Sequence, residues 1–242
     1  MTARVAPEPG LVVEALEAAG AGALRLGPLS FTLSRGDALA VLDLDGASEG
    51  LLLDALAGLV PARGRIRLDG RDLAHLGPGR RLRLGVVRAW GLPVPVRVSV
   101  ADHLARAARH AARKPTAASP PWLPAELLRR LRLAHLAHRP VWSLALPALR
   151  RVELARCLLA APRLVLWDRP FAGLSADERA ETADLIREVT RRGVMMVLAD
   201  RDGLSLGACC GLGLVLAGGR PIAQGPVAEL ADLDLDSRVS AR

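Results

Sequence analysis

The sequence predicts an α/β protein with a mainly parallel sheet, an antiparallel β region near the N-terminus and an inserted helical segment. Short apolar runs such as 163–168 and 194–200 alternate with helical stretches, which is typical of buried parallel strands joined by helices. The first 44 residues carry strand-like runs separated by Gly-containing turns. Residues 93–140 differ, since they hold two helical runs around a Pro-rich loop.

Each expected element follows from a local signal. Strands at 11–16, 24–34 and 38–44 form a β meander, and a helix over 50–58 ends at Gly58. "GRIRLDGRDLAHL" predicts a strand, a DG turn and a short second segment, and the arginine run 80–88 predicts an edge strand. The remaining expected elements, in chain order, are helices 101–114, 125–139 and 148–160, strand 163–168, helix 176–192, strand 194–200 and a hairpin around "LAGGRPIAQG".

Composition limits the class of protein and the place in the cell that we expect for it. Of 242 residues 51% are apolar but only 2% aromatic, so we expect a globular core of Leu, Val and Ala. The net charge is +8, yet the basic residues are spread along the chain, so we expect a solvated surface and no nucleic-acid partner. We expect no signal peptide, no membrane span and a cytoplasmic location. The three cysteines show neither disulfide nor metal-site spacing.

Residues 43–50, "DLDGASEG", occupy the place of a phosphate-binding loop, between an apolar strand and an apolar helix. Asp43, Asp45 and Glu49 stand where such a loop needs glycines and a lysine. A carboxylate at a helix N-terminus also satisfies free N–H groups and the helix dipole, so Glu49 has a structural interpretation. Calcium binding is a weaker alternative, because the loop only partly matches an EF-hand loop and lies between a strand and a helix.

Three longer stretches carry a family resemblance: "LLLDALAGLVPARGRIRLDGRDLAHL", "RRVELARCLLAAPRLVLWDRPFAGLSADE" and "LAGGRPIAQGPVAEL". They resemble the nucleotide-binding subunit of ABC transporters, most closely the branched-chain amino-acid importer type. The resemblance implies a P-loop NTPase-like ABC ATPase core over 1–92 and 141–242, with a helical subdomain over 93–140. It also implies ATP and Mg²⁺ as cofactors. The implied partners are transmembrane transporter subunits and a second ABC ATPase subunit, in a homodimer or heterodimer on the cytoplasmic face of the membrane.

The phosphate loop departs from the motif of this family. Asp43 and Ser48 replace its two glycines, Glu49 replaces the lysine and Gly50 replaces the hydroxyl residue, while the internal Gly46 is kept. Two like charges about 4 Å apart repel by roughly 4 kcal/mol at an effective dielectric constant near 20. A carboxylate at position 49 therefore opposes a triphosphate.

The other motifs of the family depart as well. Asp168 matches the Mg²⁺-binding aspartate, but Arg169 replaces the general-base glutamate and Arg201 the switch histidine. Arginine cannot accept a proton from water. Gly91 takes the place of the Q-loop glutamine, and residues 17–22 hold no aromatic to stack on adenine. The signature motif is replaced by Leu144, Ala145, Leu146, Pro147 and Ala148.

These replacements favour a degenerate subunit, a pseudo-ATPase with a structural or regulatory role and no bound cofactor. One alternative is a subunit of an amino-acid importer that still binds and hydrolyses ATP; a second is a basic nucleic-acid-binding protein. Because the charges are inverted, we expect Glu49 or Asp43 to pair with Arg169 or Arg201. The competing interpretation leaves these side chains in solvent. His135 and His138 are a possible metal pair without a third ligand nearby.

Overall fold

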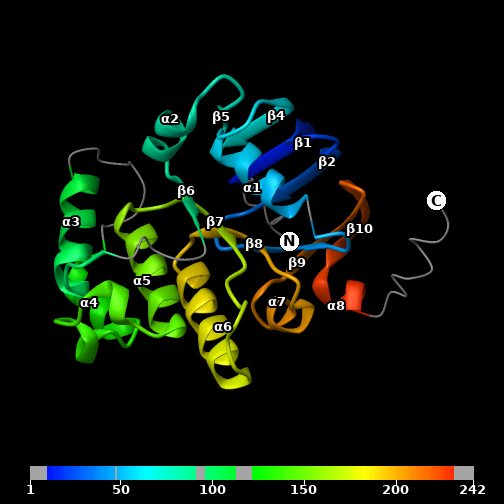
Figure 1. Ribbon diagram of the computed structural model, residues 1–242. Helices are drawn as coiled ribbons and strands as arrows, with labels where there is room; N and C mark the ends of the chain where they lie inside the picture. Colours follow the sequence, from blue (N-terminus) through cyan, green and yellow to red (C-terminus); the bar gives the residue numbers. More distant parts are fainter. Residues whose placement is uncertain (1–9, 47, 91–95, 113–121, 232–242) are drawn as a thin grey trace, which may run out of the picture.

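The computed structural model describes residues 10–46, 48–90, 96–112 and 122–231, which form two sheets and a set of helices (Figure 1). The smaller sheet is antiparallel, in the order β2-β1-β4-β5. Its strands are β1 (Leu11–Ala19), β2 (Arg25–Leu33), β4 (Ala62–Leu68) and β5 (Arg71–Asp72).

The larger sheet has six strands in the order β10-β9-β3-β8-β7-β6, and all neighbours are parallel except β9 and β10. These strands are β3 (Ala38–Asp43), β6 (Val86–Ala89), β7 (Leu164–Asp168), β8 (Met195–Ala199), β9 (Leu212–Ala217) and β10 (Arg220–Pro226). The predicted α/β fold, a mainly parallel sheet with an antiparallel region, is therefore confirmed.

The helices lie on both faces of the six-stranded sheet (Figure 1). They are α1 (Glu49–Ala57), α2 (Pro78–Arg83), α3 (Val100–Ala112), α4 (Pro124–Arg130), α5 (Leu146–Leu159), α6 (Ala176–Arg191), α7 (Gly203–Cys209) and α8 (Val227–Ala231). Helix α1 packs between the two sheets, while α3 and α4 lie at one side beside α5. No helix in the described ranges combines the length and apolarity that a membrane crossing needs.

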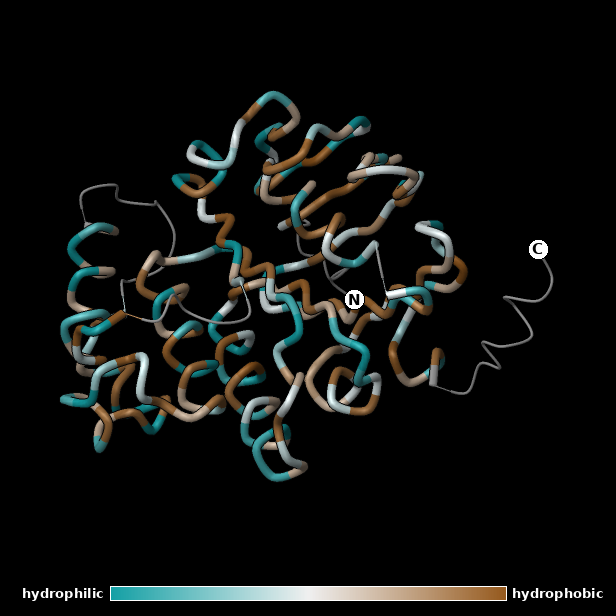
Figure 2. The backbone as a smooth tube through the Cα atoms, viewed as in Figure 1, coloured by the Kyte–Doolittle hydropathy of each residue, from teal (hydrophilic) through white to brown (hydrophobic). Residues whose placement is uncertain are grey.

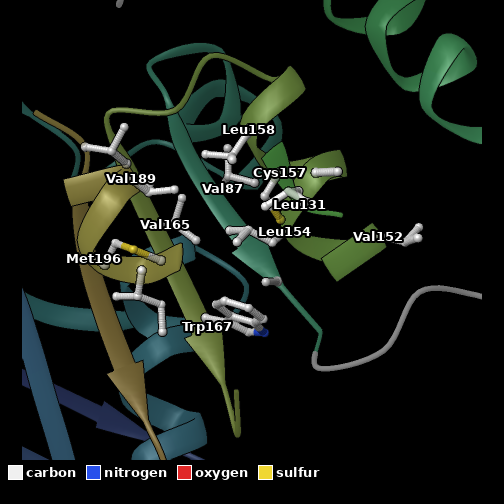
Figure 3. Close-up of a cluster of buried hydrophobic side chains, with 14 of the residues drawn as sticks. Val87, Leu131, Val152, Leu154, Cys157, Leu158, Val165, Trp167, Val189 and Met196 are labelled. Carbon is white, nitrogen blue, oxygen red and sulfur yellow. The ribbon is translucent and has the colours of Figure 1, made fainter. Parts of the chain in front are cut away.

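Alternating side chains of the central strands build two cores, one on each face of the sheet. On β7, Val165 and Trp167 face the helices α3 to α6, whereas Leu164 and Leu166 face α1 and the antiparallel sheet. Figure 3 shows Trp167 among the side chains of the first core, and Figure 2 shows apolar residues concentrated along the central strands. Burial on both faces explains why these strands read as continuous apolar runs.

Three sequence predictions of local structure were wrong. Strand 38–44 does not complete an antiparallel meander, because β3 is buried on both faces and pairs in parallel with β8 and β9. The run 80–88 is not one strand, since Pro78 starts α2 and Gly85 turns the chain into β6. The helix predicted over 125–139 ends at Arg130, because Arg132 adopts a left-handed conformation at φ 52°.

Within residues 93–140, the described part is mostly helical, as predicted, and it packs on the core through leucines. Leu104 of α3 and Leu127 of α4 are fully buried in the core that also holds α5. The division of the chain into a core and an inserted subdomain stays a prediction. Residues 93–95 and 113–121 of this segment lie outside the described residues.

Candidate functional site

The loop 43–50 follows the carboxyl end of β3 and leads into α1, the position that the sequence predicted. Asp43, 8% exposed, accepts hydrogen bonds from the Ser48 amide at 2.5 Å and the Ser48 hydroxyl at 2.7 Å. It also accepts one from the Asp45 amide at 3.2 Å, and the Gly46 amide donates to the Asp43 carbonyl at 3.1 Å. Amides of the kind that a phosphate loop turns toward phosphate are thus occupied by a side chain of the same loop.

Glu49 is the first residue of α1 and is only 4% exposed. Its Oε1 lies 3.9 Å from Nη2 of Arg169, while its buried Oε2 has no hydrogen-bond partner in the described part of the chain. Burial is the main cause that raises the pKa of Glu49, and neighbouring Asp43 raises it further. Its own backbone amide and Arg169 act in the opposite direction but do not reverse the shift.

Arg201 covers the loop at Gly46. A Cβ atom built on Gly46 would lie 2.2 Å from Nη2 of Arg201, so the guanidinium packs directly on this glycine. Gly46 has a φ of +67°, a conformation that favours glycine in any case. The backbone amide of Arg201 donates to Asp200 at 2.7 Å, which fixes the start of the segment after β8.

The predicted pairing of a loop carboxylate with an arginine is confirmed for Glu49 and Arg169, at the long distance of 3.9 Å. Arg201 behaves differently from the prediction, since it lies on the backbone at Gly46 rather than on a carboxylate. Both arginines are exposed on their outer sides. The loop therefore has two cations of its own chain beside it.

Asp168, at the end of β7, is engaged by an arginine that sequence analysis did not single out. Arg88 of β6 donates from Nη2 to Asp168 at 3.3 Å and from Nε to Asp54 of α1 at 3.1 Å. The Arg88 side chain is only 7% exposed. No local sequence signal identifies this contact, because it depends on the pairing of β6 with β7.

The five residues Leu144 to Ala148 lie at the N-terminus of α5. Ala145 caps the helix without a side-chain hydrogen bond, and Pro147 in the first turn has no amide hydrogen. Leu144 is buried and Ala145 is exposed. This helix start therefore lacks the serine and glycines that the family's signature uses.

The structure supports no metal site in the residues it describes. No group of three or more His, Cys, Asp or Glu side chains there could hold a metal ion, and this includes the loop carboxylates considered for calcium. His135 and His138 are both exposed, on the segment that follows α4. Gly50 is the second residue of α1, and Gly91 lies outside the described residues.

Comparison with known proteins gives the family. The sequence profile described as "ABC transporter" matches residues 26–172, more than half of the chain. The chain belongs to the ABC transporter family. It corresponds to the ATP-binding domain, since a hemin import ATP-binding protein of Nocardia farcinica is 32% identical over 95% of this chain and 80% of its own length.

Other ABC relatives are equally similar but longer. A probable ABC transporter ATP-binding protein of Azorhizobium caulinodans is 32% identical over 72% of this chain, and the match spans 62% of that relative. A 2-aminoethylphosphonate import ATP-binding protein of Salmonella typhimurium is 32% identical over 79% of this chain, and the match spans 52% of that relative. The Nocardia and Salmonella relatives carry different substrate names.

Solved ABC cassettes share the fold. An ATP-binding cassette of an ABC transporter in its ADP conformation aligns with a TM-score of 0.82 at 19% identity, over 97% of this chain and 99% of that one. A nucleotide-free cassette aligns with a TM-score of 0.81 at 20% identity, over 96% of this chain and 98% of that one. At these identities the likeness concerns the fold alone.

Proposed function

We propose that this ABC domain is a pseudo-ATPase that acts through protein contacts as a structural or regulatory subunit of a transporter complex. The observation that carries the proposal is the loop 43–50, which is filled by its own chain. Asp43 takes the amides of Asp45 and Ser48, and Arg201 packs on Gly46. Nucleotide binding would require both arrangements to be dismantled.

The residues present do not fit ATP and Mg²⁺. A triphosphate on this loop would approach the buried carboxylates of Asp43 and Glu49, with no lysine to offset the repulsion. Asp168, the expected Mg²⁺ ligand, is already bound to Arg88. Arg169 cannot act as a base at the position that follows Asp168.

Partner binding is the function that remains for such a domain. By family membership, the proposed partners are transmembrane subunits and a second ABC ATPase subunit, on the cytoplasmic face of the membrane. The branched-chain amino-acid importer type is also proposed, on sequence resemblance alone; the relatives named above are hemin and aminoethylphosphonate import proteins.

Calorimetric titration of the purified chain with ATP and Mg²⁺ tests the proposal. We expect no binding tighter than about 1 mM, together with no ATP turnover above background. Asp168→Ala is the control for contaminating enzymes. Saturable nucleotide binding, or a turnover that Asp168→Ala abolishes, would overturn the pseudo-ATPase assignment.

The alternative is an ATP-binding and hydrolysing importer subunit. Two observations favour it: the names of the relatives, and Asp168 at the end of β7, where the family's Mg²⁺ ligand belongs. This alternative requires Arg201 to leave Gly46 when nucleotide arrives. The same titration separates the two functions, because only the alternative gives saturable binding of ATP.

A further inference from the structure

A second pocket, separate from the loop 43–50, opens between α3, α5, β6 and α2. Its volume is about 350 Å³, and its apolar walls include Val87, Ala107 and Ala111. Small-molecule sites in proteins usually measure about 300–1,000 Å³ and are mostly apolar with a few polar groups. The pocket is therefore large enough for a compact ligand.

The polar groups around this pocket are all basic. They are Arg83, Arg106, Arg156, His103 and His110, and no Asp or Glu is among the described lining residues. Arg156 is neutralised by Glu153, to which it donates at 2.6 and 2.8 Å. Arg83 and Arg106, in contrast, form no ion pair with any residue that the structure describes, so their charges are available to a ligand.

His103 supplies a polar atom inside the pocket wall. Its Nε2 is buried and has no hydrogen-bond partner in the described ranges. Burial lowers the pKa of His103, and the positive charges of Arg156 and Arg106 lower it further. The imidazole is therefore neutral at neutral pH, and Nε2 can donate or accept one hydrogen bond, depending on the tautomer.

We propose that this pocket binds a small amphipathic anion, a carboxylate or phosphate carried on a short apolar chain. The apolar part fits against Val87, Ala107 and Ala111, and the anionic group meets the guanidinium groups of Arg83 and Arg106. An inorganic anion would leave the apolar walls unused. A neutral apolar ligand would remove water from charged side chains without replacing it.

Such a ligand would bridge two parts of the molecule, since α3 lies beside α5 (Figure 1). Arg106 belongs to α3, whereas Arg83 belongs to α2 and Val87 to β6. Binding would therefore strengthen the contact of α3 with the sheet. The proposal does not depend on whether loop 43–50 binds nucleotide.

Titration of the full chain with octanoate, octyl phosphate and octylammonium tests the pocket. We expect a dissociation constant of about 1 mM or lower for one or both anions and at least about tenfold weaker binding of octylammonium. Acetate and inorganic phosphate, which lack the chain, should bind at least about tenfold more weakly than their octyl counterparts. Comparison of the two octyl anions distinguishes a carboxylate from a phosphate ligand.

Variants locate the binding. Arg106→Gln should weaken binding of the anion about tenfold, because it removes one charge-assisted contact. Arg109→Gln is the matched control on the same helix, since Arg109 is exposed and does not line the pocket. Ala111→Leu keeps every charge but fills the pocket, and it should also abolish binding. Thermal unfolding and circular dichroism establish that each variant is folded.

Several results would overturn the proposal. One is equal affinity for octanoate, octyl phosphate and octylammonium. Another is an equal loss of affinity for the anion in the variants of Arg106 and Arg109. A third is unchanged affinity for the anion in folded Ala111→Leu. Absence of anion binding below about 10 mM would overturn it as well and would leave the pocket to a protein partner.

Discussion

The two buried carboxylates of the loop have opposite surroundings, although they lie only six positions apart. Asp43 is held by amide and hydroxyl donors from Asp45 and Ser48. Glu49 has a buried oxygen without a hydrogen bond in the described chain and a cation only at 3.9 Å. The surroundings of Glu49 therefore disfavour its charged form.

Glu49 makes stability depend on pH. Its folded pKa is raised above 4.5, so the folded state holds the proton more tightly than the unfolded state. Its contribution to the free energy of unfolding is thus most favourable at low pH and falls as pH rises through the raised pKa. Glu49→Gln should increase the free energy of unfolding at pH 8 by roughly 1 kcal/mol and should have little effect near pH 4.

Urea unfolding at several pH values measures this effect. Glu17→Gln, at an exposed position, is the control and should leave the pH dependence unchanged. A destabilised Glu49→Gln variant at pH 8 would show instead that the contact with Arg169 dominates.

Single residues of the site were predictable only where charge alone decided the contact. The exchange of Lys for Glu and of the base for Arg169 predicted that Glu49 or Asp43 would pair with Arg169 or Arg201, and the pair found is Glu49 with Arg169. The contact of Arg201 with Gly46 and that of Arg88 with Asp168 were missed. Both depend on strand pairing and side-chain conformation, which a linear sequence does not contain.

At the scale of elements, one buried arginine joins α2 to the end of α1. Arg81 is 3% exposed and donates to the carbonyl groups of Ala55 at 2.7 Å, Leu56 at 2.9 Å and Leu76 at 2.7 Å. Two of these carbonyls belong to the last turn of α1, where helix carbonyls have no partner within the helix. Arg81 thus completes the C-terminus of α1.

Replacement of Arg81 by Met should lower the free energy of unfolding by about 2–4 kcal/mol. Methionine fills part of the space but removes the Arg81 donor from the carbonyls of Leu56 and Leu76, and it leaves Ala55 with the Gly58 amide alone. Arg80→Met, one position away and exposed, should change stability by less than about 0.5 kcal/mol. Similar values for the two variants in chemical denaturation would contradict this role of Arg81.

A second contact joins the segment before α4 to the end of α6. The guanidinium of Arg192 lies 3.9 Å from the ring centre of Trp122, and that of Arg130 lies 5.9 Å away. Glu126 accepts from Arg130 at 2.8 Å and from Arg192 at 3.4 Å. Trp122, 8% exposed, is therefore packed against cations that are themselves held in place.

A double-mutant cycle of Trp122→Ala and Arg192→Ala should give a coupling free energy of about 0.5–2 kcal/mol. The same cycle with Arg191→Ala should give a value near zero, because no contact of Arg191 with Trp122 is found in the described part of the chain. Equal coupling in both cycles would mean that the arginines act only through general charge.

Sequence periodicity predicted most elements but not their neighbours. The strand at β3 was expected from its apolar run, yet its place in the six-stranded sheet follows from burial on both faces, which the meander interpretation overlooked. Helix α6 was predicted to within one residue, and its capping box of Ser175 and Glu178 explains why its start was clear. Helix α7 was missed, although Asp202 caps it through the Ser205 amide.

At the scale of the whole molecule, the ABC fold persists independently of the nucleotide site. The two cores on either face of the sheet are built by apolar side chains such as Trp167 and Leu166, and none of the loop residues 43–46 and 48–50 belongs to either core. Under the proposed function, replacement of the phosphate-binding residues would therefore leave the packing of the domain intact. This separation explains how the family fold was predictable from the sequence, whereas the expected absence of a bound cofactor stays a prediction.

Because the site changed at many positions, restoring one residue should not restore activity. Glu49→Lys alone should show no ATP binding, since Asp43 still occupies the loop amides and Arg201 still covers Gly46. A variant that also carries Asp43→Gly, Ser48→Gly, Gly50→Ser, Arg169→Glu and Arg201→His should bind ATP. Calorimetry on both variants measures the difference; binding by Glu49→Lys alone would contradict the closed loop.

The hydrogen bonds of Asp43 have a consequence for the history of the chain. Reversal of Asp43 to glycine alone would leave the Ser48 amide and hydroxyl without their acceptor, and reversal of Glu49 to lysine would place a cation near Arg169. Each of these two single substitutions toward the family's phosphate-loop motif is thus unfavourable by itself. Under the proposed function, loss of nucleotide binding in this chain would therefore be hard to reverse by single substitutions.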